Sequence, residues 1–172
     1  VYEEEFSITN LMAWSPNSQQ LAFVRFDESE VPEFSMQMFD NGLYPGYYNY
    51  KYPKAGERNS KVTLHSYDVM TKDTKTLNVP IEADSYIPRI AFTKNSDQLA
   101  VMTLNRHQNV FNMYYANPKS GVFRLILRDE NKAYVDSEWL SSIHFYDNCF
   151  SYVNEQDGYA HVYLYSPTGV LL

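Results

Sequence analysis

An aromatic residue, a polar turn centred on Asn and an apolar strand recur along this chain. The stretch "WSPNSQQLAF" from Trp14 aligns without a gap with "FTKNSDQLAV" from Phe92, and five of the ten positions are identical. A looser copy, "FYDNCFSYV", begins at Phe145 and has a shorter turn. Because apolar runs bounded by polar turn residues are typical of strands, the pattern predicts three related hairpins.

Each copy continues into a second hairpin whose first strand is rich in Tyr. The three stretches are "VTLHSYDVMTKDTKTLNV", "NVFNMYYANPKSGVFRLIL" and "AHVYLYSPTGVLL". Their turns contain Asp, Asn, Pro, Ser and Gly, the residue types that supply turn geometry. Each unit is therefore expected to contain four short strands, and four-stranded units at a period of about 50 residues are typical of propeller blades.

We therefore predict an all-β chain, a partial β-propeller of about three four-stranded antiparallel blades. An antiparallel sandwich also has many short strands, but one hairpin at a fixed place in every unit favours the propeller. A closed propeller needs at least four blades, so we expect a segment of a larger ring. The predicted units are residues 1–80, 81–132 and 133–172 of one propeller domain, with the completeness of the third left open.

A long insertion, the arm at residues 31–60, separates the second and third predicted strands of the first unit. Aromatic and Met side chains are enriched in protein interfaces relative to the remaining surface, so the arm is a candidate contact element. A loop that folds back over its own blade explains the same composition. The candidate contact residues are Phe34, Met36, Met38, Phe39, Tyr44, Tyr47 and Tyr48.

Charge and composition exclude several classes of protein. The chain has 14 basic and 21 acidic residues, a net charge of −7, and no segment gathers its Lys and Arg. Electrostatic binding to nucleic acid is therefore not expected. No stretch approaches the roughly 18 apolar residues of a membrane span, so we expect no membrane contact by this segment. The single Cys149 excludes an internal disulfide and a Cys-x-x-Cys metal site.

No motif for bond-breaking chemistry is present in the sequence. There is no Gly-x-Ser-x-Gly nucleophile elbow and no Gly-rich phosphate loop. None of the His residues has the i, i+4 spacing of a helical zinc site, and each is expected to be an ordinary strand or turn residue. We therefore expect no metal and no cofactor. The four are His65, His107, His144 and His161.

Three consecutive carboxylates, Glu3, Glu4 and Glu5, stand between Tyr2 and Phe6. Adjacent carboxylates repel one another, but an ammonium group can share its hydrogen bonds among several acceptors. A solvated acidic cap near a helix start explains the same run, because the helix dipole favours Glu there. The residues alone leave both explanations open.

Several stretches taken together resemble the β-propeller domain of the dipeptidyl peptidase IV family, serine exopeptidases of the prolyl oligopeptidase clan. They are "VYEEEFS", "WSPNSQQLAFVRFDESEVPEF", "YPKAG" and "NEQDGYAHVY", in this order, and they extend over essentially the whole chain. The resemblance implies an eight-bladed ring stacked on an α/β-hydrolase domain of the same protein, with a Ser-Asp-His triad in that absent domain. This chain alone would then be inactive.

The resemblance also implies roles for particular residues. Glu4 and Glu5 would bind the free N-terminal amine of a peptide substrate, and the parent enzyme would release Xaa-Pro or Xaa-Ala dipeptides. Trp139 is a candidate apolar contact, because the aromatic-Arg contact of some members has no clear match here. The arm would contact the partner subunit of a homodimer. Sparse cysteines favour a bacterial member that is exported to the periplasm or cell surface. The alternative is an inactive relative whose propeller serves only protein interactions.

Overall fold

The computed structural model describes residues 2–172. Apart from two short helical segments, every regular element is a β-strand, so the predicted all-β class is confirmed. The elements in chain order are α1 (Tyr2–Phe6), β1 (Met12–Trp14), β2 (Gln20–Asp27), β3 (Glu33–Met38), β4 (Gly46–Lys51), β5 (Lys61–Asp68), β6 (Thr74–Leu77), β7 (Tyr86–Phe92), β8 (Leu99–Leu104), β9 (Val110–Ala116), β10 (Phe123–Glu130), the 3-10 helix η1 (Ser137–Ser142), β11 (His144–Phe145), β12 (Phe150–Asn154) and β13 (His161–Tyr165).

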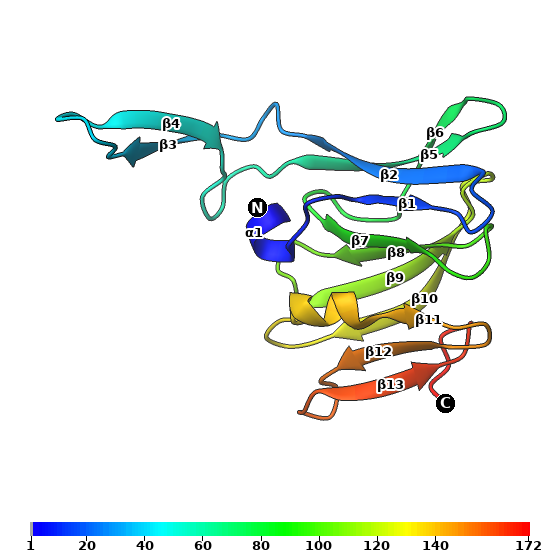
Figure 1. Ribbon diagram of the computed structural model, residues 1–172. Coiled ribbons are helices and arrows are strands. Elements are labelled where there is room, and N and C mark those ends of the chain that lie inside the picture. The colour runs from blue at the N-terminus through cyan, green and yellow to red at the C-terminus, as the bar shows by residue number, and fades with distance from the viewer. Residues whose placement is uncertain (1) are drawn as a thin grey trace.

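Three antiparallel sheets follow one another along the chain and lie side by side, as blades of a propeller do (Figure 1). Their strand orders are β1-β2-β5-β6, β7-β8-β9-β10 and β11-β12-β13. The arm interrupts the first sheet between its second and third strands, as predicted, and forms the separate hairpin β3-β4. The chain is therefore a partial β-propeller.

The third sheet differs from the predicted four strands. It has three strands, and its outer edge carries a bridge between Tyr165 and Leu171. The turn at 166–170, in which Ser166 N–H donates to Val170 O at 2.8 Å, returns the chain to β13, where Leu172 N–H donates to Leu164 O at 2.8 Å. The four-strand prediction is confirmed for the first two sheets, and the third, whose completeness was left open, has three strands and the pairing of these last residues.

The first two repeated hairpins share the backbone hydrogen bond that closes the turn and an Asn side chain that accepts from the N–H two residues on. In the first sheet Ser15 N–H donates to Gln20 O at 2.9 Å, and in the second Thr93 N–H donates to Gln98 O at 3.0 Å. The third turn is shorter, as predicted. The first two turns also contact each other, because the Asn17 N–H donates to Ser96 Oγ at 3.1 Å.

Strand β8 shows how a blade is buried on both faces. All six of its residues are buried, and successive side chains of a strand point to opposite faces. Leu99 and Val101 pack with the apolar residues of the first sheet, whereas Ala100, Met102 and Leu104 pack toward the third sheet. Burial on two faces explains why five of the six residues of the strand are apolar instead of alternating with polar ones.

Candidate functional site

The acidic motif lies on α1, a single helical turn held by two aromatic side chains. Tyr2 and Phe6 are four residues apart, so they share one helix face, and both are buried with ring centroids 5.7 Å apart. The three Glu residues occupy the exposed surface of the turn. The helix ends at Phe6, and the next residue, Ser7, has a left-handed φ of 53°.

An aromatic cluster fixes this turn to the two neighbouring sheets. The Tyr2 ring lies 4.6 Å from Phe26 of β2, and the Phe6 ring lies 5.1 Å from Tyr86 of β7. Burial raises the pKa of the Tyr2 phenol, so this side chain stays uncharged. Because an isolated helix of five residues is unstable in water, these contacts determine where the glutamates lie.

Glu4 and Glu5 line the same cavity, about 360 Å³ in volume, between α1, β7 and η1. Glu138 adds a third carboxylate to its lining, and Arg89 is the one guanidinium there. Carboxylates therefore outnumber cationic groups around this cavity. Such a surplus favours the binding of a cation over that of an anion.

Arg89 is a site residue that the sequence did not indicate. Its guanidinium donates to Ser141 Oγ through Nε at 3.2 Å and through Nη2 at 3.0 Å, which holds η1 against β7. Burial lowers the pKa of this guanidinium, but an Arg remains charged at neutral pH. The charge therefore persists beside the glutamate pair.

Glu3 faces a different cavity. It shares with Glu4 a space of about 420 Å³ between α1 and the base of the arm, where Tyr50 and Lys51 are further lining residues. Glu4 thus borders both cavities, whereas Glu5 lines only the one beside η1. The three adjacent carboxylates are therefore not equivalent.

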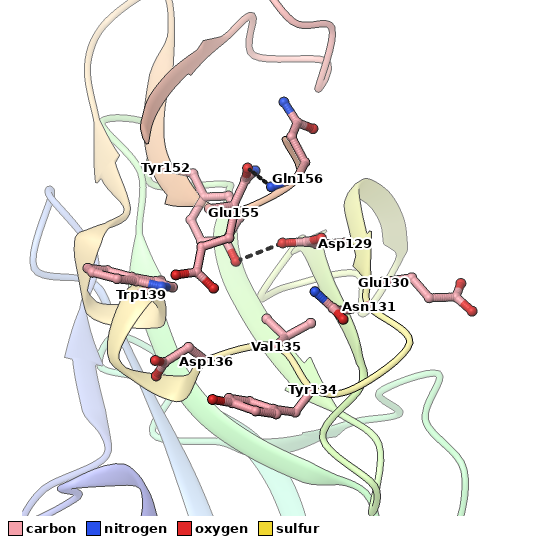
Figure 2. Close-up of a pocket in the computed structure, with 11 residues that line it drawn as sticks. Asp129, Glu130, Asn131, Tyr134, Val135, Asp136, Trp139, Tyr152, Glu155 and Gln156 are labelled. Carbon is pink, nitrogen blue, oxygen red and sulfur yellow. Dashed lines mark hydrogen bonds between the residues drawn. The ribbon is translucent and has the colours of Figure 1, made fainter. Parts of the chain in front are cut away.

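Trp139 is not brought into the cavity of Glu4 and Glu5. It lines a smaller space of about 130 Å³ between the end of β10, η1 and the end of β12 (Figure 2). Tyr152 in this space donates to Asp129 Oδ2 at 3.2 Å, and burial raises the pKa of the Tyr152 phenol. The Trp139 indole N–H is buried and has no hydrogen-bond partner among the residues described.

The arm projects away from the sheets as a two-stranded hairpin (Figure 1). Phe34 differs from the other candidate contact residues, because it is half-buried and its ring packs against Tyr50 and Tyr52. The remaining six are exposed, with Phe39 at 75% and Tyr44 at 87% of their full area. We call these six the arm patch: Met36, Met38, Phe39, Tyr44, Tyr47 and Tyr48.

No group of three or more His, Cys, Asp or Glu side chains among residues 2–172 is placed to hold a metal ion. No helix in the same range has the length and apolar character needed to span a bilayer.

Fold and site together define a propeller segment with an acidic helical turn beside its blades. A family model described as the dipeptidyl peptidase IV (DPP IV) N-terminal region matches residues 1–171. The chain belongs to this family, and the resemblance seen in the sequence is confirmed.

Individual relatives agree with this assignment. The chain is 32% identical over 154 residues to dipeptidyl-aminopeptidase B of Aspergillus niger, a match that covers 81% of this chain and 17% of the relative. The crystal structure of Porphyromonas gingivalis dipeptidyl peptidase 4 superposes with a TM-score of 0.94 at 60% identity, covering all of this chain and 25% of that one.

A second solved structure, a putative dipeptidyl aminopeptidase IV from Bacteroides ovatus, has a TM-score of 0.83 at 27% identity. It covers 99% of this chain and 24% of its own. The chain therefore spans about a quarter or less of the length of the relatives it matches.

Proposed function

We propose that this chain is the substrate-recognition part of a serine dipeptidyl peptidase, in which Glu4 and Glu5 together bind the N-terminal ammonium group of a peptide. The observation that carries this proposal is their shared cavity: both line it, whereas Glu3 does not. The aromatic anchors of α1 hold the pair in place. A preorganised pair of carboxylates is suited to an ammonium, because charge-assisted hydrogen bonds are strong.

Binding the amine at a fixed place determines where the peptide is cut. Two residues of extended chain span about 7 Å, so an ammonium held at the glutamates places the second carbonyl at a fixed distance from them. A nucleophile at that distance, in an α/β-hydrolase domain of the same protein, would release dipeptides. An acetylated N-terminus or a longer overhang would not fit this arrangement.

The test uses the full-length peptidase that contains this segment. Glu4→Gln and Glu5→Gln should each lower kcat/KM for an Xaa-Pro-p-nitroanilide substrate. The expected fall corresponds to a loss of about 2 to 4 kcal/mol in transition-state binding, the usual loss when a charged group loses its partner. Glu3→Gln is the matched control, because it removes the same charge from the same turn but faces the other cavity. Unchanged kinetics in either test variant would remove that residue from the proposed site.

The arm supports a second part of the proposal, a homodimer contact. The six side chains of the arm patch are exposed on a hairpin that leaves the body of the sheets. Exposed aromatic and Met side chains on a projecting hairpin are typical of protein interfaces. We further propose that the full-length protein is exported to the periplasm or cell surface, which fractionation of cells producing it would test.

The arm patch also favours the second candidate, a non-catalytic relative that uses its propeller only for protein contacts. The two candidates differ in the remainder of the coding sequence. A peptidase needs a nucleophile elbow of the Gly-x-Ser-x-Gly type in its hydrolase domain, and an inactive relative does not.

A further inference from the structure

The carboxylate of Glu5 is held by a residue of the neighbouring sheet. Gln108, which is 103 positions further along the chain, donates from Nε2 to Glu5 Oε1 at 2.8 Å. Gln108 lies in the turn between β8 and β9 of the second sheet, whereas α1 precedes the first sheet. The candidate amine site therefore combines groups from two adjacent blades.

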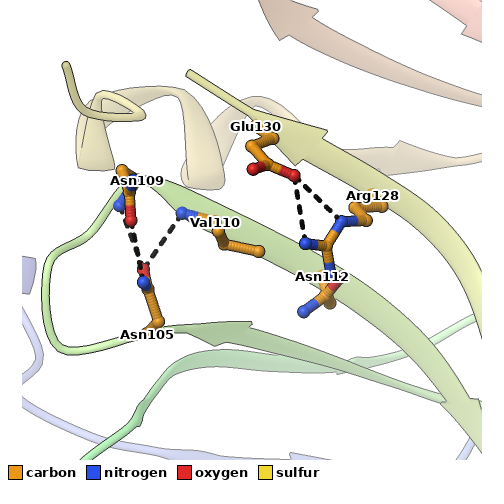
Figure 3. Close-up of polar contacts among 6 residues, drawn as sticks. All are labelled: Asn105, Asn109, Val110, Asn112, Arg128 and Glu130. Atoms are coloured by element: carbon orange, nitrogen blue, oxygen red, sulfur yellow. Dashed lines mark hydrogen bonds and ion pairs between the residues drawn. The ribbon is translucent and has the colours of Figure 1, made fainter. Parts of the chain in front are cut away.

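Several hydrogen bonds hold the turn that carries Gln108. The Asn105 side chain brackets it, because its Oδ1 accepts from the N–H groups of Asn109 and Val110, both at 3.0 Å (Figure 3). The Gln108 N–H donates to Asn105 O at 2.9 Å, and the Gln108 carbonyl accepts from Val135 N–H at 2.7 Å. The backbone of Gln108 is thus fixed on both sides, so its side chain projects from a defined point.

The backbone conformation gives no reason for a Gln at this place. Gln108 has a φ of 54°, in the left-handed region, where Gly has no steric penalty and Asn a smaller one than most residues. A Gln there adds strain that Gly would relieve. What Gln supplies and Gly lacks is an amide long enough to reach Glu5.

The choice of an amide donor also suits a carboxylate that must bind a cation. A Lys or Arg in its place would form an ion pair with Glu5 and compete with a substrate ammonium. An uncharged amide fixes the carboxylate through one oxygen and leaves its negative charge in place. Fixing the side chain beforehand lowers the conformational entropy lost on binding.

We infer that Gln108 is a positioning residue for substrate binding, which orients the Glu5 carboxylate toward the N-terminal ammonium group. This inference rests on the proposed function of Glu5. Gln108 itself does not touch the substrate in this account. It acts on the part of the binding free energy that depends on the substrate amine.

The experiment compares Gln108→Gly with Lys72→Gly in the full-length peptidase. Lys72 is an exposed turn residue of the first sheet with a φ of 62°, so its replacement relieves the same kind of strain far from the site. For a free-amine Xaa-Pro-p-nitroanilide, Gln108→Gly should raise KM roughly tenfold with kcat nearly unchanged, because ground state and transition state lose the same contact. Lys72→Gly should change neither parameter.

Two further readouts separate positioning from a merely structural role. The midpoint of thermal unfolding should stay equal or rise in Gln108→Gly, and KM for the corresponding des-amino substrate should not change. Gln108→Asn should behave like Gln108→Gly, since its amide is one methylene shorter, and it serves if the Gly variant does not fold. Equal losses for both substrates, or an unchanged KM for the free-amine substrate, would overturn the inference.

Glu5→Gln in the same assay separates this inference from the proposed function. If Glu5→Gln lowers kcat/KM and Gln108→Gly leaves KM unchanged, only the role of Gln108 is wrong. If Glu5→Gln has no effect, the proposed function of Glu5 is wrong, and the role of Gln108 is rejected with it.

Discussion

Removal of the Phe6 ring should detach the acidic turn from the propeller without unfolding the sheets. Phe6 is 2% exposed, and its ring centroid lies 5.7 Å from Tyr2 and 5.1 Å from Tyr86. Truncation of a buried Phe to Ala costs about 3 to 5 kcal/mol. A helical turn of five residues has little stability of its own, so a loss of this size exceeds what holds α1 in place.

The expected result for Phe6→Ala in the full-length protein has two parts. Amide hydrogen exchange followed by mass spectrometry should show faster exchange in residues 2–8 and unchanged exchange in β8, whose residues are all buried. The value of kcat/KM for a free-amine substrate should fall at least as far as in Glu5→Gln. Phe6→Leu is the matched control, because it keeps an apolar anchor and should lose much less.

Two results would refute this reasoning. If residues 2–8 of Phe6→Ala keep their protection, the aromatic cluster is not what holds the acidic turn. If protection is lost but kcat/KM stays at the wild-type value, the position of the glutamates does not matter for substrate binding.

Three further predictions concern stability and assembly. Gly169→Ala should lower the free energy of unfolding in urea by at least about 2 kcal/mol. The reason is that Gly169 has a φ of 87° and an added Cβ would lie 1.8 Å from Ile126 O. Gly46→Ala, with open space around it, should cost little, and equal effects of the two variants would contradict this. Backbone N–H groups of the following turn hold the pKa of the Asp68 carboxyl below its ordinary 3.8. The ionised carboxylate therefore stabilises the folded protein fully above pH 3.8, and this contribution is lost as the pH falls below that value. Wild type should therefore be more stable than Asp68→Asn near pH 6 and approach it in acid, and a constant difference would contradict this. Tyr44→Arg in the arm patch should weaken a dimer about tenfold in analytical ultracentrifugation without changing the thermal midpoint, and an unchanged Kd would count against the arm interface.

Much of the fold could be predicted from the sequence, because each blade begins with a similar hairpin of an aromatic residue, a polar turn and an apolar strand. Asn17 and Asn95 occupy aligned turns, and each side-chain oxygen accepts from the backbone N–H two residues on, which explains why the Asn recurs. The insertion of the arm between two strands of one sheet was also predictable, since the repeat continues on both sides of it. In the third unit the predicted Ser-Pro-Thr-Gly turn is followed by Leu171 and Leu172, which pair with β13.

The candidate site was predictable only in part. The acidic run is visible in the sequence, but its residues alone left a solvated cap and a binding site open, and only the family resemblance selected Glu4 and Glu5. Arg89 lines the cavity of the glutamates and Gln108 contacts Glu5, because the second sheet packs beside α1. Neither residue belongs to a recognisable sequence motif. A left-handed φ at a Gln leaves no mark in the sequence, so the strain at Gln108 appears only in three dimensions.

Trp139 was selected as a candidate apolar substrate contact because of its residue type, and this role stays a prediction. The structure adds that residues of η1 line two separate cavities. Ser137 and Ser141 border that of the glutamates, and Trp139 borders the other. Which cavity a side chain enters depends on the orientation of one short helix, which composition does not encode.

A thermodynamic cycle between the glutamates and the substrate amine tests most directly whether Glu4 and Glu5 bind the ammonium group. In the full-length peptidase, kcat/KM would be measured for a free-amine dipeptidyl substrate and its des-amino analogue, with wild type and with the Glu4→Gln/Glu5→Gln double variant. Wild type should prefer the free amine by roughly 100-fold or more, and the double variant should lose most of this preference. A preference that survives in the double variant would contradict the assignment of Glu4 and Glu5 to the ammonium group.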